Sequence, residues 1–236
     1  MRARLRELLR NEDGFTLVEL AVAMPIALIV IGGMVIMLTT LTHYQNQNQE
    51  ELTLQTEARS ALNRLETQIR GAFYGDGSTA AISSATATGV TFYTPDQYAA
   101  TVSGSTLSTF HLKQVSYRVS NGLLQTQFQT TTNTYPTAPP WTFPGTMSTW
   151  TTVVGSAGAV TNTDVFSFWD QCNAQGVACT GASTPAAMTF PIAAANLSQI
   201  AYVVVKLTLS TAGGGVGSQA TSFTVTDSIA IRGTSE

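Results

Sequence analysis

Few residues of this chain combine a reactive type with a spacing that could do chemistry. Asp164 and Asp170 bracket an aromatic run, and two carboxylates can serve as general acid and base, although spacing alone carries little weight. The 236 residues contain no nucleophile elbow, Walker loop, HExxH pattern or dinucleotide fingerprint. His43 and His111 lie far apart, and His111 falls in a predicted strand, as a structural or surface histidine would. We therefore expect no catalytic residue and no cofactor.

The two cysteines, Cys172 and Cys179, flank the short stretch NAQGVA. A zinc site would need more ligands than these, and no CxxC spacing occurs. If the domain is exported, a disulfide that closes this short loop is the expected state. In a reducing compartment the two residues would instead be free thiols.

Glu19 is the most unusual polar residue, because it stands at the front of a long apolar run. From Leu20 to Leu38 the chain carries no charge, and at about 1.5 Å per helical residue this run spans roughly 28 Å, close to the hydrocarbon thickness of a bilayer. A carboxylate inside a membrane span costs about 2.5–3.5 kcal/mol even on the milder insertion scales. Such a residue calls for a specific role.

The charges around the apolar run set its orientation. Loops rich in arginine stay in the cytoplasm, so the leader is expected inside and the polar C-terminal part outside. A cleavable signal peptide would have a shorter apolar core and a small-residue cleavage site, whereas LTTLTHYQNQ follows the run here. A plain signal anchor accounts for length and orientation but not for Glu19. The leader arginines are Arg2, Arg4, Arg6 and Arg10.

The stretch GFTLVELAVAM, with its arginine-rich leader, closely resembles the prepilin signature of type IV pilins and of the pseudopilins of type II secretion. The resemblance implies that a membrane-embedded prepilin peptidase cuts between Gly14 and Phe15 on the cytoplasmic side. It also implies that Phe15 becomes the N-methylated first residue of the mature chain. Glu19 matches the family's glutamate, five residues into that chain.

Electrostatics suggests a role for Glu19. Cleavage leaves a positive amine at Phe15, at the end of a helix where an anion is favoured. In a filament, Glu19 of one subunit would meet the Phe15 amine of its neighbour, and a buried pair is tolerable where either charge alone is costly. We hypothesise that this pair fixes the register of assembly. The alternative is a glutamate that merely sits at the level of the lipid headgroups.

Pro25 and the tandem Gly32-Gly33 are predicted irregularities of this helix. Proline removes one backbone hydrogen bond and clashes with the carbonyl of Ala21, and each glycine costs about 1 kcal/mol relative to alanine. The resemblance implies local unwinding within a filament, although Pro25 lies earlier than the usual proline of the family. A simple kink tolerated by the membrane is the alternative.

The helix is predicted to continue beyond the membrane as an amphipathic segment. Apolar residues recur at spacings of four, three, four and four, which places them on one helix face. We expect one helix from about Phe15 to about Ala72, with this face packed under a globular domain. The residues of the face are Ala58, Leu62, Leu65, Ile69 and Phe73.

The sequence pattern predicts mainly β-strands for the rest of the chain. Charged residues make up only 11%, against roughly 25% in soluble globular proteins, and Thr and Ser replace them, which favours a β-rich extracytoplasmic domain. Asn121-Gly122 predicts a tight hairpin turn within 110–129. A further strand is predicted over residues 89–95, where Pro95 is expected to end it. A second hairpin is predicted from the strands 200–210 and 222–232.

In the region 130–191 the sequence pattern predicts secondary structure less clearly. TTTNTYPTAPPWTFPGT is expected to form a loop, and 164–172 a strand. Trp141, Trp150 and Trp169 either fill a small subsidiary core or form a contact surface. The predicted fold class is α+β: a long N-terminal helix, membrane-spanning in its first half, packed on a C-terminal antiparallel sheet of about four to six strands, pilin-like in architecture.

These predictions divide the chain into four parts. Residues 1–14 form a cytoplasmic leader peptide, 15–41 a transmembrane or filament-core helix, 42–74 its amphipathic continuation, and 75–236 an extracytoplasmic β-rich domain. The Tyr117–Gly122 hairpin and a final strand ending in arginine are similar to W-type minor pilins and to the J-type minor pseudopilin. Because some pseudopilins bind calcium, Asp76, Asp164 or Asp170 could ligate it, but none lies in an EF-hand pattern, and we predict no metal site.

The resemblance implies a minor type IV pilin that primes or caps a filament, with a minor pseudopilin or a DNA-uptake pilin as alternatives. Its implied partners are other pilin subunits, the prepilin peptidase, the inner-membrane assembly platform and, before assembly, membrane lipid. The implied location is the inner membrane, with the C-terminus outside, and then a surface pilus or periplasmic pseudopilus. Net charge is −3 and the helix arginines share no face, so we expect no nucleic-acid partner. Those arginines are Arg59, Arg64 and Arg70.

Overall fold

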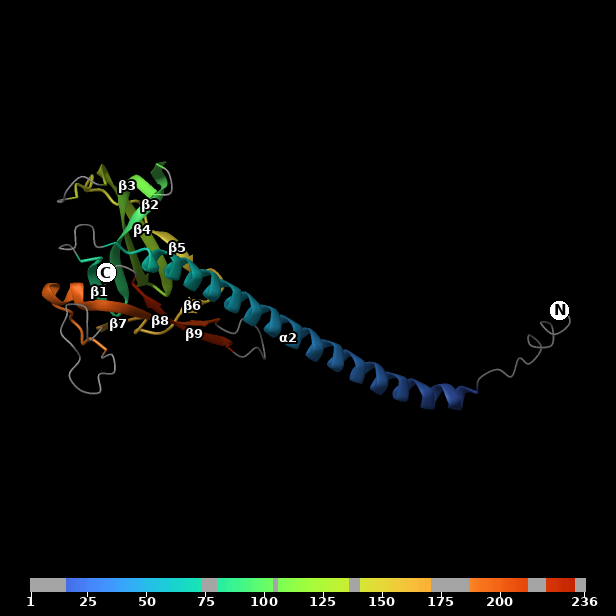
Figure 1. Cartoon of the computed structure of the whole chain (residues 1–236). Coiled ribbons are helices and arrows are strands. Elements are labelled where there is room, and N and C mark those ends of the chain that lie inside the picture. The colour runs from blue at the N-terminus through green and yellow to red at the C-terminus, as the bar shows by residue number, and fades with distance from the viewer. Residues whose placement is uncertain are drawn as a thin grey trace, which may run out of the picture. The chain divides into compact units, whose positions relative to one another are not determined.

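The computed structural model describes residues 16–73, 80–103, 106–135, 141–170, 187–211 and 220–231. The chain divides into two compact units, Met1–Asn48 and Gln49–Glu236 (Figure 1). Helix α2 (Leu17–Arg70) supplies residues to both units. Its range agrees closely with the predicted helix from about Phe15 to about Ala72.

In the first unit α2 is an apolar helix with exposed side chains. Among the described residues it is the one helix long and apolar enough to cross a membrane, judged by length and composition alone, and none of its most apolar window is buried within the protein. Leu17 is 85% exposed and Ile29 74%. Exposed apolar surface on this scale marks a segment that lipid or a partner covers.

The hydroxyl groups at the end of the apolar run are satisfied within the helix. Thr39 and Thr40 both donate through Oγ1 to the carbonyl oxygen of Ile36, at 2.8 Å each. Thr42 donates in the same way to the carbonyl oxygens of Leu38 and Thr39. Threonine can satisfy its hydroxyl by bonding back to the preceding helical turn, so these polar groups are compatible with an apolar environment.

The predicted irregularities of the helix lie inside a continuous α2. Pro25 stands within the helix, and a Cβ added at Gly32 or Gly33 would meet no described atom within 4 Å. Among the described residues, no neighbour therefore packs so closely on these two positions that it requires glycine there. Unwinding in a filament concerns an assembled state, and it stays a prediction.

In the second unit the same helix buries one face. Apart from the adjacent pair Ala61 and Leu62, its buried residues are spaced by three or four positions, and all but Leu54 and Ala61 belong to the predicted apolar face. The face is therefore a core-packing surface, as predicted, although Phe73 at its end is only half-buried. The buried helical residues are Leu54, Ala58, Ala61, Leu62, Leu65 and Ile69.

Five strands form an antiparallel sheet, called sheet A, in the order β1-β2-β3-β4-β5. Each strand pairs with the next along the chain, so the sheet is a meander. The bounds are β1 (Ile82–Thr86), β2 (Gly89–Ser103), β3 (Thr106–Ser120), β4 (Leu123–Tyr135) and β5 (Thr151–Val154).

The turn between β3 and β4 confirms the hairpin prediction. Asn121 has φ 53° and Gly122 has φ 72°, the two positive values that a type I′ turn requires. By contrast, β2 does not stop at Pro95. Its pairing with β1 reaches only Phe92, so Pro95 lies where β2 needs no donor toward that side, and the strand continues to Ser103.

Four strands form a second sheet, sheet B, in which β8 pairs with β6, β7 and β9. The predicted second hairpin is confirmed, since β8 and β9 pair without a register shift. The predicted single sheet is thus two sheets, and the strand expected over 164–172 is shorter. The bounds are β6 (Ala159–Val160), β7 (Phe166–Asp170), β8 (Ile200–Ser210) and β9 (Ser222–Ala230), with a 3-10 helix η1 (Ala194–Gln199) before β8.

One hydrophobic core joins the helix to both sheets. It contains residues of α2 such as Leu65, of sheet A such as Phe92 and Tyr117, and of sheet B such as Phe168 and Leu207. The rings of Phe92 and Tyr117 stack with centroids 6.3 Å apart. The α+β prediction of a long helix packed on an antiparallel β-domain is therefore confirmed.

Candidate functional site

The start of α2 is a capping box built from Thr16 and Glu19. The Thr16 backbone N–H and its Oγ1 hydroxyl both donate to Oε2 of Glu19, at 3.1 Å each. In return, the Glu19 backbone N–H donates to Thr16 Oγ1 at 3.3 Å. This reciprocal pattern satisfies amides that have no partner in the first turn of a helix.

The capping box gives Glu19 a local function that the sequence reasoning missed. The signal was readable, because Thr followed three residues later by Glu before an apolar run is the sequence signature of this motif. Cleavage after Gly14 would leave the motif intact, since Thr16 would be the second residue of the product. Gly14 and Phe15 lie outside the described residues, so cleavage, methylation and the registry role of Glu19 stay predictions.

A second carboxylate, that of Glu57, fastens α2 to the loop between β5 and β6. Its Oε1 accepts from the N–H of Gly155 and of Ser156, at 3.0 Å each, and from the Ser156 hydroxyl at 2.7 Å. Its Oε2 accepts from the Ala157 N–H at 3.1 Å. Partial burial opposes ionisation, but these hydrogen bonds outweigh it and hold the pKa of Glu57 below its ordinary value.

Tyr117 makes a further polar contact between α2 and sheet A. Its hydroxyl donates to Oε1 of Gln68 at 2.8 Å. Burial raises the pKa of Tyr117, against the opposing effects of the Arg64 charge and a hydrogen bond with Thr126. Tyr117 is therefore neutral at physiological pH, and it joins the helix to the sheet through a buried ring with a satisfied hydroxyl.

The predicted loop of 130–146 is partly strand and partly a segment bound to sheet A. Residues up to Tyr135 belong to β4. Within 141–150, the Phe143 ring stacks on Tyr93 with centroids 5.7 Å apart. The Ser148 N–H donates to the Phe128 carbonyl oxygen at 2.8 Å, so this segment is anchored to sheet A at separate points.

The three tryptophans are all half-buried rather than fully buried. The Arg118 guanidinium lies 3.9 Å from the ring centroid of Trp150, a cation–π contact. Trp169 stacks on Tyr202 with centroids 6.5 Å apart. These contacts assign Trp150 to sheet A and Trp169 to sheet B, so the two do not form one subsidiary core.

The residues singled out for acid–base or metal chemistry are not brought together in the described part. Asp164 has its closest charged partner in Lys206, at 3.9 Å, and no contact joins it to Asp170. Within the described ranges, no three His, Cys, Asp or Glu side chains gather in a cluster. Asp76, Cys172 and Cys179 lie outside the described residues, so the disulfide stays a prediction.

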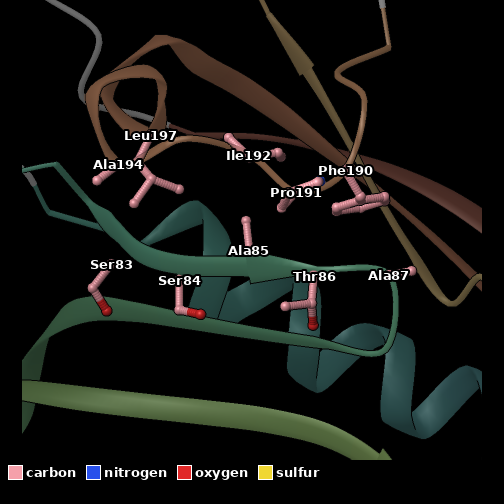
Figure 2. Close-up of a pocket in the computed structure, with 10 residues that line it drawn as sticks. All are labelled: Ser83, Ser84, Ala85, Thr86, Ala87, Phe190, Pro191, Ile192, Ala194 and Leu197. Atoms are coloured by element: carbon pink, nitrogen blue, oxygen red, sulfur yellow. The ribbon is translucent and has the colours of Figure 1, made fainter.

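A shallow pocket of about 500 Å³ lies between β1 and the segment that leads into η1 (Figure 2). The hydroxyls of Ser83 and Thr86 are used within sheet A, as donors to the carbonyl oxygens of Thr91 and Gly89. The lining carries no charged side chain, which suits an uncharged apolar group. The lining residues are Ser83, Ser84, Ala85, Thr86, Ala87, Phe190, Pro191, Ile192, Ala194 and Leu197.

The fold and the helix start define a pilin-like α+β protein, in which a long apolar N-terminal helix continues into a β-rich domain. The family model of the prokaryotic N-terminal methylation motif matches residues 9–35. This stretch includes the predicted cleavage point, Glu19, Pro25 and the two helix glycines, and it is a type IV pilin-like signature. The match supports the type IV pilin and pseudopilin family, with its processing by a prepilin peptidase and its assembly with other pilin subunits. No curated protein matches the chain.

Proposed function

We propose that this protein is a minor type IV pilin, a structural subunit that primes or caps pilus assembly after cleavage at Gly14 and N-methylation at Phe15. The observation that carries the proposal is the methylation motif over residues 9–35, continuous with an exposed apolar helix. The β-rich domain at the other end of α2 would then be the part displayed outside the membrane.

The geometry of the helix start supports assembly through Glu19. The carboxylate stands in the first turn of α2 and already bonds to Thr16. After cleavage the Phe15 amine of a neighbouring subunit would be the cation that this carboxylate meets in an apolar filament core. Helix capping and registry are thus two separable functions of one side chain.

The capping box allows a sharp test of registry. Glu19→Gln keeps a residue that suits the third position of a capping box but removes the charge, whereas Thr16→Ala removes the cap and keeps the charge. We expect Glu19→Gln to be cleaved normally and to be lost from sheared filaments. Incorporation of Glu19→Gln at the wild-type yield would refute the registry function, and Glu50→Gln, on an exposed part of the same helix, is the matched control.

Mass spectrometry of the mature N-terminus tests the proposal as a whole. The expected product begins at Phe15 and carries one added methyl group, and it is recovered in sheared filaments at low copy number relative to a major subunit. An intact Met1 terminus in membrane fractions would overturn the pilin function altogether. Recovery of the processed chain in a periplasmic filament, with loss of protein secretion on deletion, would assign it instead to a type II secretion pseudopilus.

A further inference from the structure

The connection between the two sheets contacts helix α2 through Glu57 and Leu54. Strand β5 ends sheet A at Val154 and β6 begins sheet B at Ala159 (Figure 1). We call the four residues between them, 155–158, the crossover loop. All three layers of the second unit therefore meet at this loop.

Glu57 holds the crossover loop through four hydrogen bonds to one carboxylate. Three donors are consecutive backbone N–H groups, those of Gly155, Ser156 and Ala157, and successive amides that converge in this way form an anion-binding concavity. The helix thus supplies its own anion to a loop about 100 residues further along the chain. Charged acceptors make the stronger class of hydrogen bond.

Packing closes the crossover loop on its other sides. A Cβ on Gly155, whose φ is 121°, would lie 2.4 Å from Cδ2 of Leu123 in the β3–β4 hairpin. A Cβ on Gly158 would lie 2.5 Å from Cδ2 of Leu54 on the helix and 2.9 Å from the carbonyl oxygen of Ser210 at the end of β8. The loop is therefore confined by the helix, by sheet A and by sheet B.

We propose that Glu57 is a latch that holds the crossover loop, the connection between the two sheets, closed on α2. When the carboxylate is removed or neutralised, the crossover loop opens locally while the core of each sheet stays folded. The latch is a conformational device, and it does not depend on whether the protein assembles into a pilus.

The described segments that pack on the Glu57 carboxylate bring no second charge to it. The helix neighbours of Glu57 at three and four residues are Thr53, Leu54, Ser60 and Ala61. The crossover loop, the hairpin turn 120–123 and the end of β8 at 208–210 carry no titratable group. Because the hydrogen bonds hold the pKa of Glu57 below 4.5, the latch stays closed at neutral pH and opens as the pH falls through that lowered value.

Hydrogen exchange with mass spectrometry on the full chain in detergent micelles tests the latch. In Glu57→Gln, one amide oxygen replaces two carboxylate oxygens and the NH₂ group faces N–H donors. At neutral pH we expect the amides of 155–157 to exchange about ten- to a hundredfold faster than in the wild type, the range that follows from losing charge-assisted bonds. Peptides from β7 and β8 should keep their protection, and Glu50→Gln should exchange like the wild type throughout.

Two further measurements keep the latch falsifiable if Glu57→Gln folds poorly. Ser156→Ala removes the 2.7 Å hydroxyl contact alone and should give a smaller acceleration in the same three amides. In the wild type, acidification through the lowered pKa of Glu57 should accelerate these amides beyond their intrinsic change, and Glu57→Gln should show no such step. Unchanged exchange in both variants, or equal acceleration across β7 and β8, would overturn the proposal.

Discussion

The contact between Gly158 and Leu54 allows a quantitative test of how tightly the crossover loop packs on the helix. A methyl group at position 158 would stand 2.5 Å from Cδ2 of Leu54 and 2.9 Å from the carbonyl oxygen of Ser210, both closer than van der Waals contact. Overpacking of this kind costs about 1–3 kcal/mol. Leu54 is 0% exposed, and truncation of a buried leucine to alanine costs about 2–5 kcal/mol.

The two substitutions should not add. Leu54→Ala removes Cδ2, the nearer of the two obstacles, so Gly158→Ala should cost less in that background. We expect the double variant to lose about 1–2 kcal/mol less than the sum of the single variants, within the usual range for contacting residues. The remaining cost comes from the backbone of Ser210, which cannot move away like a side chain.

Urea unfolding of the full chain in detergent, followed by tryptophan fluorescence, measures these free energies. Gly145→Ala is a control, because a Cβ there would meet no described atom within 4 Å and its cost reflects only its φ of 81°. Additive losses, within about 0.5 kcal/mol, would refute the reasoning that Leu54 and Gly158 are in contact.

Three more predictions concern the same unit. Gly122→Ala should lower the free energy of unfolding by about 1–2 kcal/mol, because Gly122 has φ 72° and a Cβ would lie 3.1 Å from that of Ala159; an unchanged urea midpoint would contradict this. Tyr117→Phe should cost about 0.5–1.5 kcal/mol, because it removes the hydroxyl that bonds to Gln68 at 2.8 Å and interacts with Thr126 and Arg64, and Gln68→Ala should cost less in the Tyr117→Phe background than it does alone. The lowered pKa of Glu57 adds stability that is fully present above pH 4.5 and is lost as the pH falls through the lowered value; in Glu57→Gln this part of the pH dependence should vanish, and an identical acid profile in both proteins would disprove it.

Local chemistry made much of this fold predictable. The face from Ala58 to Ile69 follows the helical period, and Asn121-Gly122 specifies its turn through backbone conformation, so neither depends on distant residues. The β8–β9 hairpin is also predictable from the sequence, because both strands are long runs of residues with high β-propensity. The same is true of the Thr16–Glu19 capping box, whose pattern is visible in the sequence although the sequence reasoning did not use it.

What escaped prediction depends on contacts between distant parts of the chain. Strands β5 and β6 have four and two residues, too short for any alternation to show, and without them the division into two sheets cannot be seen. The loop prediction failed at the end of β4 because the partner strand, and not local propensity, holds Tyr135 in the ladder. Glu57 resembles any surface glutamate of a helix until the fold brings residues 155–157 to it.

The inward bonding of Thr39, Thr40 and Thr42 to helix carbonyls has a consequence for transfer between environments. With these hydroxyls internally satisfied, that stretch offers hydrocarbon to whatever surrounds it, whether acyl tails or the flanks of like helices. Transfer of this stretch from acyl tails to the flanks of like helices then changes its solvation free energy little. A preference for one packing arrangement of the helices would have to come from polar groups at the start of α2, such as the Glu19 carboxyl group.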